Sequence, residues 1–377
     1  MIIKNVQVFG EDRVFRSGEV AIADEKFVAP NGQDDVIIDG KGYYAIPGLI
    51  DIHFHGSKGD DFCDADVAAI ERIAAYQASV GVTSICPATM TLPEAELHNI
   101  MKAAASYQGE EGARLVGINL EGPFISSKKK GAQAATYIQT CNLPLFQELQ
   151  EESGGLIQLV DIAPETEGAL AFIEAVKDKV TISIAHTTAD YDTAMQAFEA
   201  GVSHVTHLYN AMPPLNHRNP GVIGAAFEAK HCFVELICDG IHIHPAVVRA
   251  TFAMFGAERV VLISDCIRAT GLSDGQYTLG GQEVTLKEGK CTLADGTIAG
   301  SSKNLMECMK TAVQKMGIPL ETAVGCVTMN PAKSIGIYDS YGSITVGKTA
   351  DLVLLDQDLN VKAIYINGKE YGKEEKH

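Results

Sequence analysis

Residues 47–56 read PGLIDIHFHG, a Pro-Gly turn followed by a short apolar strand that ends in two histidines. Side chains at positions i and i+2 of a strand point to the same side, so His53 and His55 are predicted to share one face and could bind one metal ion there. Histidine pairs at this spacing are also common by chance. The role of the pair therefore depends on the fold to which this strand belongs.

Downstream of this stretch, helix and strand patterns alternate. Residues 64–80 predict a helix, with Asp64 and Asp66 as candidate N-caps and Gly81 as the stop. Similar helices are predicted at 94–107, 167–179, 189–200, 245–256 and 304–316. Eight apolar runs of strand length lie at 49–52, 82–86, 115–120, 157–162, 180–185, 204–206, 233–238 and 260–263. Eight strands alternating with helices predict an α/β protein with a (β/α)₈ TIM-type barrel, whose chemistry lies at the carboxyl ends of its strands.

The two ends of the chain have a different pattern. Residues 1–50 and 337–377 both predict short strands separated by turns. We therefore expect one small β-sandwich domain formed by both termini, and a hydrolase barrel over residues 51–336. Two unrelated β extensions are the alternative for the ends. A doubly wound open sheet is the alternative for the middle, and it is less favoured because no GxGxxG sequence follows the first strand.

Charge and composition limit the classes of partner. Forty-eight acidic against 30 basic residues give a net charge of -18, a field that repels nucleic acid and anionic membranes, so neither is expected as a partner. An anionic substrate would need a locally basic pocket. The first residues alternate like a strand, which is unlike a signal peptide, and no apolar run has the length of a membrane span. The nine cysteines form no CxxC pair. These features favour a cytoplasmic protein with reduced thiols.

Metal-ligand side chains stand at the carboxyl ends of several predicted strands. Glu121 ends the third strand, His186 the fifth, His207 the sixth and Asp265 the eighth. A buried histidine is more often structural, but one carboxylate and two neutral imidazoles at one rim suit zinc or iron(II) with a position left open for water. Asp265 could cap a helix or form an ion pair. Its functional interpretation is a general base that takes a proton from the attacking water and passes it to the leaving group.

Six further motifs occur in a fixed order: EGPF from 121, AHT from 185, THLYNAM from 206, NPGVIG from 219, DGIH from 239 and SDC from 264. Together with PGLIDIHFHG, this set resembles the amidohydrolase superfamily, and within it the N-acetylglucosamine-6-phosphate deacetylase family, over essentially the whole chain. The resemblance implies hydrolysis of the acetamide of N-acetylglucosamine 6-phosphate to glucosamine 6-phosphate and acetate. It also implies a homodimer and one or two divalent ions, zinc or iron, in each subunit.

The resemblance also assigns residue roles. Metal binding falls to Glu121, His186 and His207, and the acid/base role to Asp265. Contacts with the amino-sugar phosphate fall to Ala132, Gln133, Asn210, Ala211, Arg218, His242, Ile298, Ala299 and Gly300. Arg218 and His242 would supply the cations that a phosphate needs in an acidic protein. A surface ion pair and a strand-end hydrogen bond are the alternative roles of these two side chains.

The chain departs from the family pattern at two places. Gln133 stands where some members have histidine, and an amide can donate a hydrogen bond but cannot carry a proton. Some members lack the pair His53 and His55, which leaves a second metal site open here. Many amidohydrolases with two ions bridge them by a carboxylated lysine after the fourth strand. The fourth predicted strand here is followed by no lysine, so Glu121 would have to bridge any pair of ions. The Lys128–Lys130 run is expected in a solvated loop, and the remaining histidines (98, 204, 217, 231, 244 and 377) are expected to be structural or exposed.

Two other functions remain open on the residues. Another amidohydrolase, such as a cyclic-amide hydrolase or a deaminase, would act on an unphosphorylated substrate and be indifferent to the loss of Arg218. A catalytically inactive sugar-phosphate or metal-binding protein would bind ligand without releasing acetate. In the favoured mechanism the oxyanion is stabilised by the metal and by a donor such as His242 or Gln133.

Overall fold

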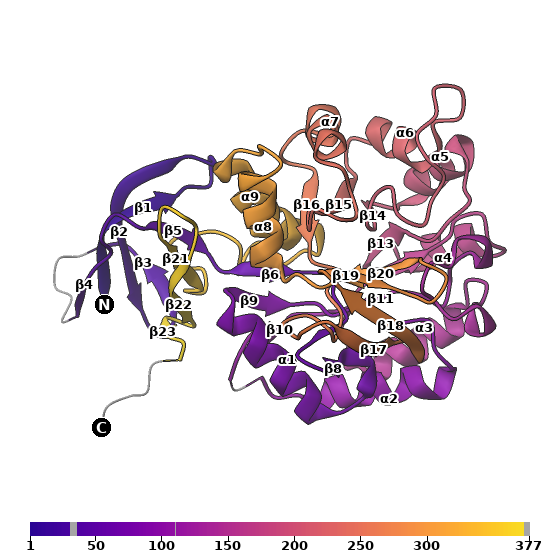
Figure 1. Ribbon diagram of the computed structural model, residues 1–377, viewed down its shortest axis with the longest axis horizontal. Coiled ribbons are helices and arrows are strands. Elements are labelled where there is room, and N and C mark those ends of the chain that lie inside the picture. The colour runs from indigo at the N-terminus through magenta and orange to yellow at the C-terminus, as the bar shows by residue number, and fades with distance from the viewer. Residues whose placement is uncertain (31–35, 110, 373–377) are drawn as a thin grey trace.

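The computed structural model describes residues 1–30, 36–109 and 111–372. Strands from the two ends of the chain, drawn in indigo and yellow, lie together at one side of a larger body of strands and helices (Figure 1). The passage between the two parts is the stretch that opens at Pro47. Gly48 lies in this passage, where a Cβ would come 2.1 Å from the Thr83 hydroxyl, so the close approach there requires glycine.

The smaller part is one eight-stranded sheet to which both chain ends contribute. Its order is β23-β22-β21-β5-β1-β2-β3, with β4 paired to β1. Strand β5 (Tyr44–Pro47) pairs antiparallel with β21 (Leu352–Leu355), and this pairing joins the N-terminal strands to the C-terminal ones. The other strands are β1 (Ile2–Phe9), β2 (Phe15–Ala23), β3 (Lys26–Val28), β4 (Ile37–Asp39), β22 (Val361–Ile366) and β23 (Lys369–Glu370).

The larger part is a barrel of parallel strands. Each of the eight predicted runs contains observed strand: β6 (Leu49–Asp51), β9 (Val82–Ile85), β10 (Arg114–Leu115) with β11 (Ile118–Leu120), β12 (Ile157–Ile162), β13 (Thr181–Ile184), β14 (His204–Val205), β15 (Phe233–Ile237) and β16 (Val260–Ile263). The third run is split because Val116 N bonds to Ile85 O on one neighbour, whereas Ile118 N bonds to Leu156 O on the other side. The ring closes where Asp265 N donates to His53 O at 2.9 Å. The predicted α/β barrel is confirmed.

Helices surround this barrel: α1 (Val67–Ser79), α2 (Glu94–Ser106), α3 (Leu143–Glu152), α4 (Ala169–Val176), α5 (Tyr191–Ala200), α6 (Gly221–Glu228), α7 (Pro245–Phe255), α8 (Leu305–Gln314), α9 (Leu320–Val327) and α10 (Met329–Ser334). Of the two aspartates proposed as caps for the first helix, Asp66 is the N-cap and accepts from Ala68 N. Asp64 instead belongs to a preceding short 3-10 helix (Phe62–Asp64). None of the described helices has the length and apolar character needed to cross a membrane.

An antiparallel sheet of four strands is inserted between β16 and α8, and the sequence patterns did not predict it. It consists of β17 (Gly275–Leu279), β18 (Gln282–Lys287), β19 (Lys290–Thr292) and β20 (Ile298–Ser301). Ser301 N donates to Asp265 O at 2.7 Å, so β20 is attached to the barrel rim directly beside Asp265. This attachment is what brings the segment Ile298–Gly300 to the carboxyl ends of the strands.

Candidate functional site

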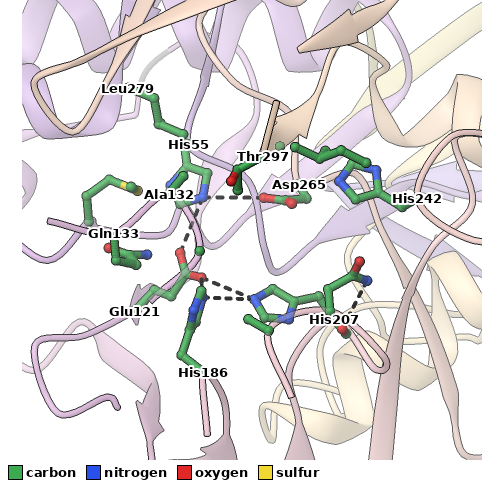
Figure 2. Close-up of a pocket in the computed structure, with 16 residues that line it drawn as sticks. His55, Glu121, Ala132, Gln133, His186, His207, His242, Asp265, Leu279 and Thr297 are labelled. Atoms are coloured by element: carbon green, nitrogen blue, oxygen red, sulfur yellow. Dashed lines mark hydrogen bonds and ion pairs between the residues drawn. The ribbon is translucent and has the colours of Figure 1, made fainter. Parts of the chain in front are cut away.

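Glu121 lies on the turn that follows β11, and Figure 2 shows its carboxylate among His55, His186 and His207; His53 is a fourth neighbour. Its Oε1 is 3.0 Å from His186 Nε2 and 3.4 Å from His207 Nε2. Its Oε2 is 3.3 Å from His55 Nε2 and 3.6 Å from His53 Nε2. Each carboxylate oxygen therefore faces one pair of imidazoles, and all five side chains are buried.

These side chains and Asp265 form two groups with metal-binding geometry. Glu121, His186 and His207 form the first group, and His53, His55 and Asp265 form the second; within each group the ligand atoms lie within 4.8 Å of one another. Asp265 Oδ1 is 3.4 Å from His55 Nε2. The structure thus brings together all six ligand and acid/base residues that the sequence singled out. It also places Asp265 among potential ligands, where the sequence indicated only an acid/base role.

The backbone turns sharply at three of these strand ends. His186, His207 and Asp265 have φ values of 44°, 31° and 49°, in the left-handed region that side chains with a Cβ rarely adopt. Such conformations cost about 1–3 kcal/mol each and persist where surrounding contacts fix them. Here Ser126 N bonds to His186 O at 2.9 Å, and Asp265 N bonds to His53 O at 2.9 Å. The strained turns aim these side chains into the mouth of the barrel.

The first group has the donor set of a cation site. His186 Nδ1 lies 2.9 Å from the Lys129 carbonyl, which can only accept, so the proton is on Nδ1 and the Nε2 lone pair faces inward. That lone pair is 3.0 Å from Glu121 Oε1 and 3.1 Å from His207 Nε2. At such distances these atoms repel one another unless a proton on His207 Nε2 or a metal ion lies between them. These residues fit a divalent ion held by nitrogen and oxygen ligands.

The charges around both groups also favour a cation. Burial raises the pKa of Glu121, but the imidazoles around it have the larger combined effect and hold that pKa well below its ordinary value. Burial lowers the pKa of His53, yet the carboxylates of Glu235 and Glu121 together raise it well above its ordinary value. The carboxylates of Glu121 and Glu235 therefore favour positive charge at this position, either a proton on His53 or a metal ion that replaces the proton on Nε2. His53 Nε2 and Glu121 Oε2 are buried without a hydrogen-bond partner among the described residues, which leaves ligand atoms available.

A cavity of about 280 Å³ opens over the two groups. Predicted substrate residues that line it are Ala132, Gln133, Asn210, Ala211, His242, Ile298 and Gly300, beside His55, Glu121, His186, His207 and Asp265. Met90, Leu279 and Thr297 also line the cavity and were not predicted. This volume suits a ligand of the size of a small metabolite.

Residues 44–371 match the model of the amidohydrolase family. The chain belongs to the amidohydrolase family. Its relatives include the N-acetylglucosamine-6-phosphate deacetylase of Bacillus subtilis, 38% identical with 96% of this chain and 94% of the relative covered. The N-acetylgalactosamine-6-phosphate deacetylase of Escherichia coli O157:H7 is 35% identical, with 86% of both chains covered. The predicted resemblance to these deacetylases is confirmed.

Solved structures of the family agree. A mutant of the N-acetyl-D-glucosamine-6-phosphate deacetylase of Mycobacterium smegmatis, in complex with N-acetyl-D-glucosamine-6-phosphate, superposes with a TM-score of 0.91. It is 32% identical to this amidohydrolase, and 98% of each chain is covered. The N-acetylglucosamine-6-phosphate deacetylase of Pasteurella multocida gives a TM-score of 0.92 at 28% identity, with 99% of each chain covered.

Two predicted donors of this amidohydrolase are oriented toward the cavity by their neighbours (Figure 2). Gln133 Oε1 accepts from Thr91 N at 2.7 Å, which leaves the amide nitrogen of Gln133 free to donate. His242 Nδ1 lies 2.8 Å from Asp239 Oδ2. Burial raises the pKa of Asp239, but hydrogen bonding to His242 and the charge of that imidazole lower it overall, so Asp239 accepts as a carboxylate. His242 Nε2 thus remains available.

Two predicted contacts do not line the cavity of the amidohydrolase. Arg218 is exposed, on the loop between Asn210 and α6, and its guanidinium has no hydrogen bond or ion pair with any residue the structure describes. Ala299 is fully buried between two residues that do line the cavity. The sequence motifs place both residues next to the site, but neither side chain lines the cavity.

The expectation of a solvated lysine run is wrong at Lys129. This residue is half-buried, its carbonyl orients His186, and its Nζ donates to Met212 O at 3.3 Å. Among the remaining histidines, His98 pairs with Glu152 at 2.6 Å, while His377 lies outside the described residues. His217 is exposed and His244 caps α7, which agrees with the expectation of structural or exposed histidines.

Glu235 is a further site residue that the sequence did not predict. It lies inside β15, fully buried, 3.0 Å from His53 Nδ1. The signal was present in the sequence, since a single acid interrupts the apolar run of residues 233–238. A buried carboxylate requires partners, so such an acid in a barrel strand predicts a polar network beneath the rim.

Proposed function

We propose that this chain hydrolyses the acetamide of N-acetyl-D-glucosamine 6-phosphate to D-glucosamine 6-phosphate and acetate, as a step of amino-sugar catabolism. The observation that carries the proposal is the arrangement around Glu121, whose carboxylate faces both ligand groups in the lining of the cavity. The relatives that match nearly the whole chain are deacetylases of amino-sugar phosphates by name. The substrates in the names of these relatives are the reason for proposing an amino-sugar phosphate as the substrate of this chain.

The cofactor we propose is zinc or iron(II), with one or two ions in each subunit. Glu121, His186 and His207 would hold the first ion. His53, His55 and Asp265 would hold a second, with Glu121 Oε2 directed toward it at 3.3 Å from His55 Nε2. Imidazole and carboxylate donors suit either metal. A divalent ion bound there would polarise the acetamide carbonyl and lower the pKa of water.

Asp265 is the group we assign to proton transfer. Burial raises its pKa, but the hydrogen bond with His55 and the neighbouring imidazoles lower it overall, so Asp265 is a carboxylate that can accept a proton. It takes the proton of the attacking water and delivers it to the nitrogen of the breaking C–N bond, which leaves as the amine. Gln133 donates a hydrogen bond to the carbonyl oxygen as negative charge develops there; His242 Nε2 is the alternative donor, in which case Arg218 alone would bind the phosphate.

The substrate contacts we propose surround the same cavity. Ala132 and Gln133 lie on one loop, Asn210 and Ala211 on the turn after β14, and Ile298 and Gly300 on β20; Ala299, buried between the last two, would contact substrate through its backbone. We assign the phosphate to Arg218 and His242. The free guanidinium of Arg218 supports this assignment, because a bidentate cation without an internal partner is available to a phosphate.

Acetate release tests the function directly. Purified protein with quantified zinc or iron is incubated with N-acetylglucosamine 6-phosphate, N-acetylgalactosamine 6-phosphate and unphosphorylated N-acetylglucosamine. We expect acetate and a free amine in equal amounts from the first substrate. Preference for the galactosamine substrate would assign the chain to the specificity of its Escherichia coli relative. Equal turnover of the unphosphorylated sugar would contradict the proposal, and ligand binding without acetate would favour an inactive binding protein.

Arg218→Met should weaken binding of the phosphorylated substrate. A hydrogen bond to a charged group contributes about 1.5–3 kcal/mol, so KM for N-acetylglucosamine 6-phosphate should rise about 10-fold or more. The kcat/KM for the unphosphorylated sugar should not change. Arg16→Met, which removes an exposed charge paired with Asp12 in the terminal sheet, is the matched control. Equal effects of Arg218→Met on both sugars would exclude Arg218 from phosphate binding.

Metal removal should abolish activity and lower stability together. Dialysis against a chelator takes away an ion that binds the folded state, and zinc at 100 times its dissociation constant restores about 2.7 kcal/mol. We expect the melting temperature to fall by several degrees and to recover with zinc or iron(II). Full activity in protein that contains no measurable metal would contradict the proposed cofactor.

We further propose that residues 1–50 and 337–377 act as one β-sandwich domain beside the barrel of residues 51–336. Its support is the set of hydrogen bonds between the two ends of the chain: Phe27 N bonds to Lys348 O at 3.0 Å, and Ala350 N bonds to Glu25 O at 2.9 Å.

We propose a homodimer from the family resemblance, and light scattering tests it. A cytoplasmic location is proposed on the nine free thiols, of which seven are buried.

A further inference from the structure

Glu235 lies beneath the two ligand groups, at the middle of β15, and no solvent reaches it. Its carboxylate faces three nitrogen atoms. Oε2 is 3.0 Å from His53 Nδ1 and 3.0 Å from His207 N, and Oε1 is 3.2 Å from His204 Nε2. One carboxylate therefore contacts a histidine of the second ligand group and the strained turn that carries a histidine of the first.

The hydrogen bonds fix which nitrogen of each imidazole carries a proton. A carboxylate only accepts, so a hydrogen bond to Glu235 requires the proton of His53 on Nδ1. In the neutral imidazole that a metal ligand requires, His53 Nε2 is then a lone pair directed at the second group, 3.6 Å from Glu121 Oε2 and 3.8 Å from Asp265 Oδ1. It is fully buried and has no hydrogen-bond partner in the described chain. This is the tautomer that a metal ligand needs.

The network continues away from the site and holds Glu235 in place. His204 Nδ1 lies 2.8 Å from Ser334 Oγ, at the end of α10. When the serine hydroxyl donates to Nδ1, His204 carries its proton on Nε2 and donates it to Glu235. Every member of the set is then satisfied with Glu235 as an anion. Since His204, Glu235 and Ser334 come from separate elements, the arrangement is anchored by the barrel and not by one loop.

We propose that Glu235 is a positioning residue that holds His53 in the tautomer with a free Nε2, and thereby sets the affinity of the second group, His53, His55 and Asp265, for a divalent ion. The inference rests on the proposed function and adds a residue outside both ligand groups. Partners of this kind typically change metal affinity by about 10–100-fold when removed. The first ion is less affected, because Glu235 reaches His207 only through its peptide N–H.

Zinc titration of the metal-free protein, with the number of bound ions quantified, tests this with two variants. Glu235→Met keeps the length of the side chain without its acceptors; we expect the second dissociation constant to rise about 10–100-fold and the first to change less. Glu235→Gln keeps an acceptor for His53 and His207, and its amide can donate to His204 once that imidazole changes tautomer. We expect Glu235→Gln to bind both ions with affinities close to those of the unaltered protein.

Asp161→Asn is the matched control. Asp161 is as deeply buried on β12 and accepts from Thr206 Oγ1 at 2.7 Å, but it hydrogen-bonds to neither ligand group. The Asp161→Asn variant should bind two ions with the dissociation constants of the unaltered protein. Equal losses in Asp161→Asn and Glu235→Met, or a second ion bound by Glu235→Met with unchanged affinity, would overturn the inference. So would a single ion per chain in the unaltered protein at saturating zinc.

A measurement on the unaltered zinc-loaded protein covers the case in which Glu235→Met does not fold. A proton on His53 Nδ1 that is hydrogen-bonded to a carboxylate should give a strongly downfield imidazole N–H resonance, assigned by its loss in His53→Asn. It should move upfield in Glu235→Gln, which offers a neutral acceptor. No such resonance from His53 would overturn the inference.

The two proposals fail differently. Acetate release with only one bound ion would preserve the proposed function and refute the role of Glu235. Two bound ions, one of them lost in Glu235→Met, without acetate release from any sugar, would preserve the role of Glu235 and refute the function.

Discussion

Asp265→Asn should lower kcat for acetate release by at least about 1,000-fold while the ion of the first group stays bound. The amide keeps the shape of the carboxylate and can still donate or accept a hydrogen bond. It cannot take a proton from water and return it to the amine, and both transfers are needed for each turnover. Because Asp265 is outside the group Glu121, His186 and His207, the metal bound there should remain. Turnover at saturating substrate and metal content are measured on the same preparation.

The position of Asp265 in the second group makes a control necessary. Its Oδ1 lies 3.4 Å from His55 Nε2, so Asp265→Asn could also weaken a second ion. His55→Asn removes a second-group ligand and leaves the carboxylate of Asp265 in place. If proton transfer is the main role of Asp265, Asp265→Asn at saturating zinc should be far less active than His55→Asn. Equal activities would instead make Asp265 a ligand, and full activity of Asp265→Asn would refute both roles.

The barrel could be predicted from the sequence because its signals are local. Each strand is a short apolar run, and turn residues such as Gly81 mark the ends of the helices. The ligands were predictable for a related reason: Glu121, His186 and His207 each follow such a run, and parallel strands in a barrel bring their carboxyl ends to one rim. The contact of Glu121 with both ligand groups could be predicted only as a possibility, because it depends on distances between residues that are far apart in the sequence.

What could not be predicted depends on partners far apart in the chain. Glu235 and His53 are 182 positions apart, and neither the tautomer nor the pairing is visible in a local pattern. The left-handed turns at His186 and His207 were hidden because their residue types do not signal a positive φ, as glycine would. The inserted sheet from Gly275 to Ser301 was missed because it adds antiparallel strands to a region where the barrel pattern predicts a loop.

Glu121→Ala should empty both ligand groups, which no other single substitution at the site should do. Its Oε1 lies 3.0 Å from His186 Nε2 and its Oε2 lies 3.3 Å from His55 Nε2, so one truncation removes an oxygen from each group. It also leaves buried imidazoles facing one another without the carboxylate that balances a cation. We expect zinc content near zero after dialysis and no measurable acetate release.

Three variants together test this prediction. His186→Asn should lose the ion of the first group only, and His55→Asn the ion of the second only, whereas Glu121→Ala should lose both. Zinc per chain and melting temperature are measured for all three, so that loss of metal is separated from loss of fold. If Glu121→Ala retained one ion with unchanged affinity, its carboxylate would belong to a single group. The two groups would then be independent sites, because no other described residue contributes an oxygen to both.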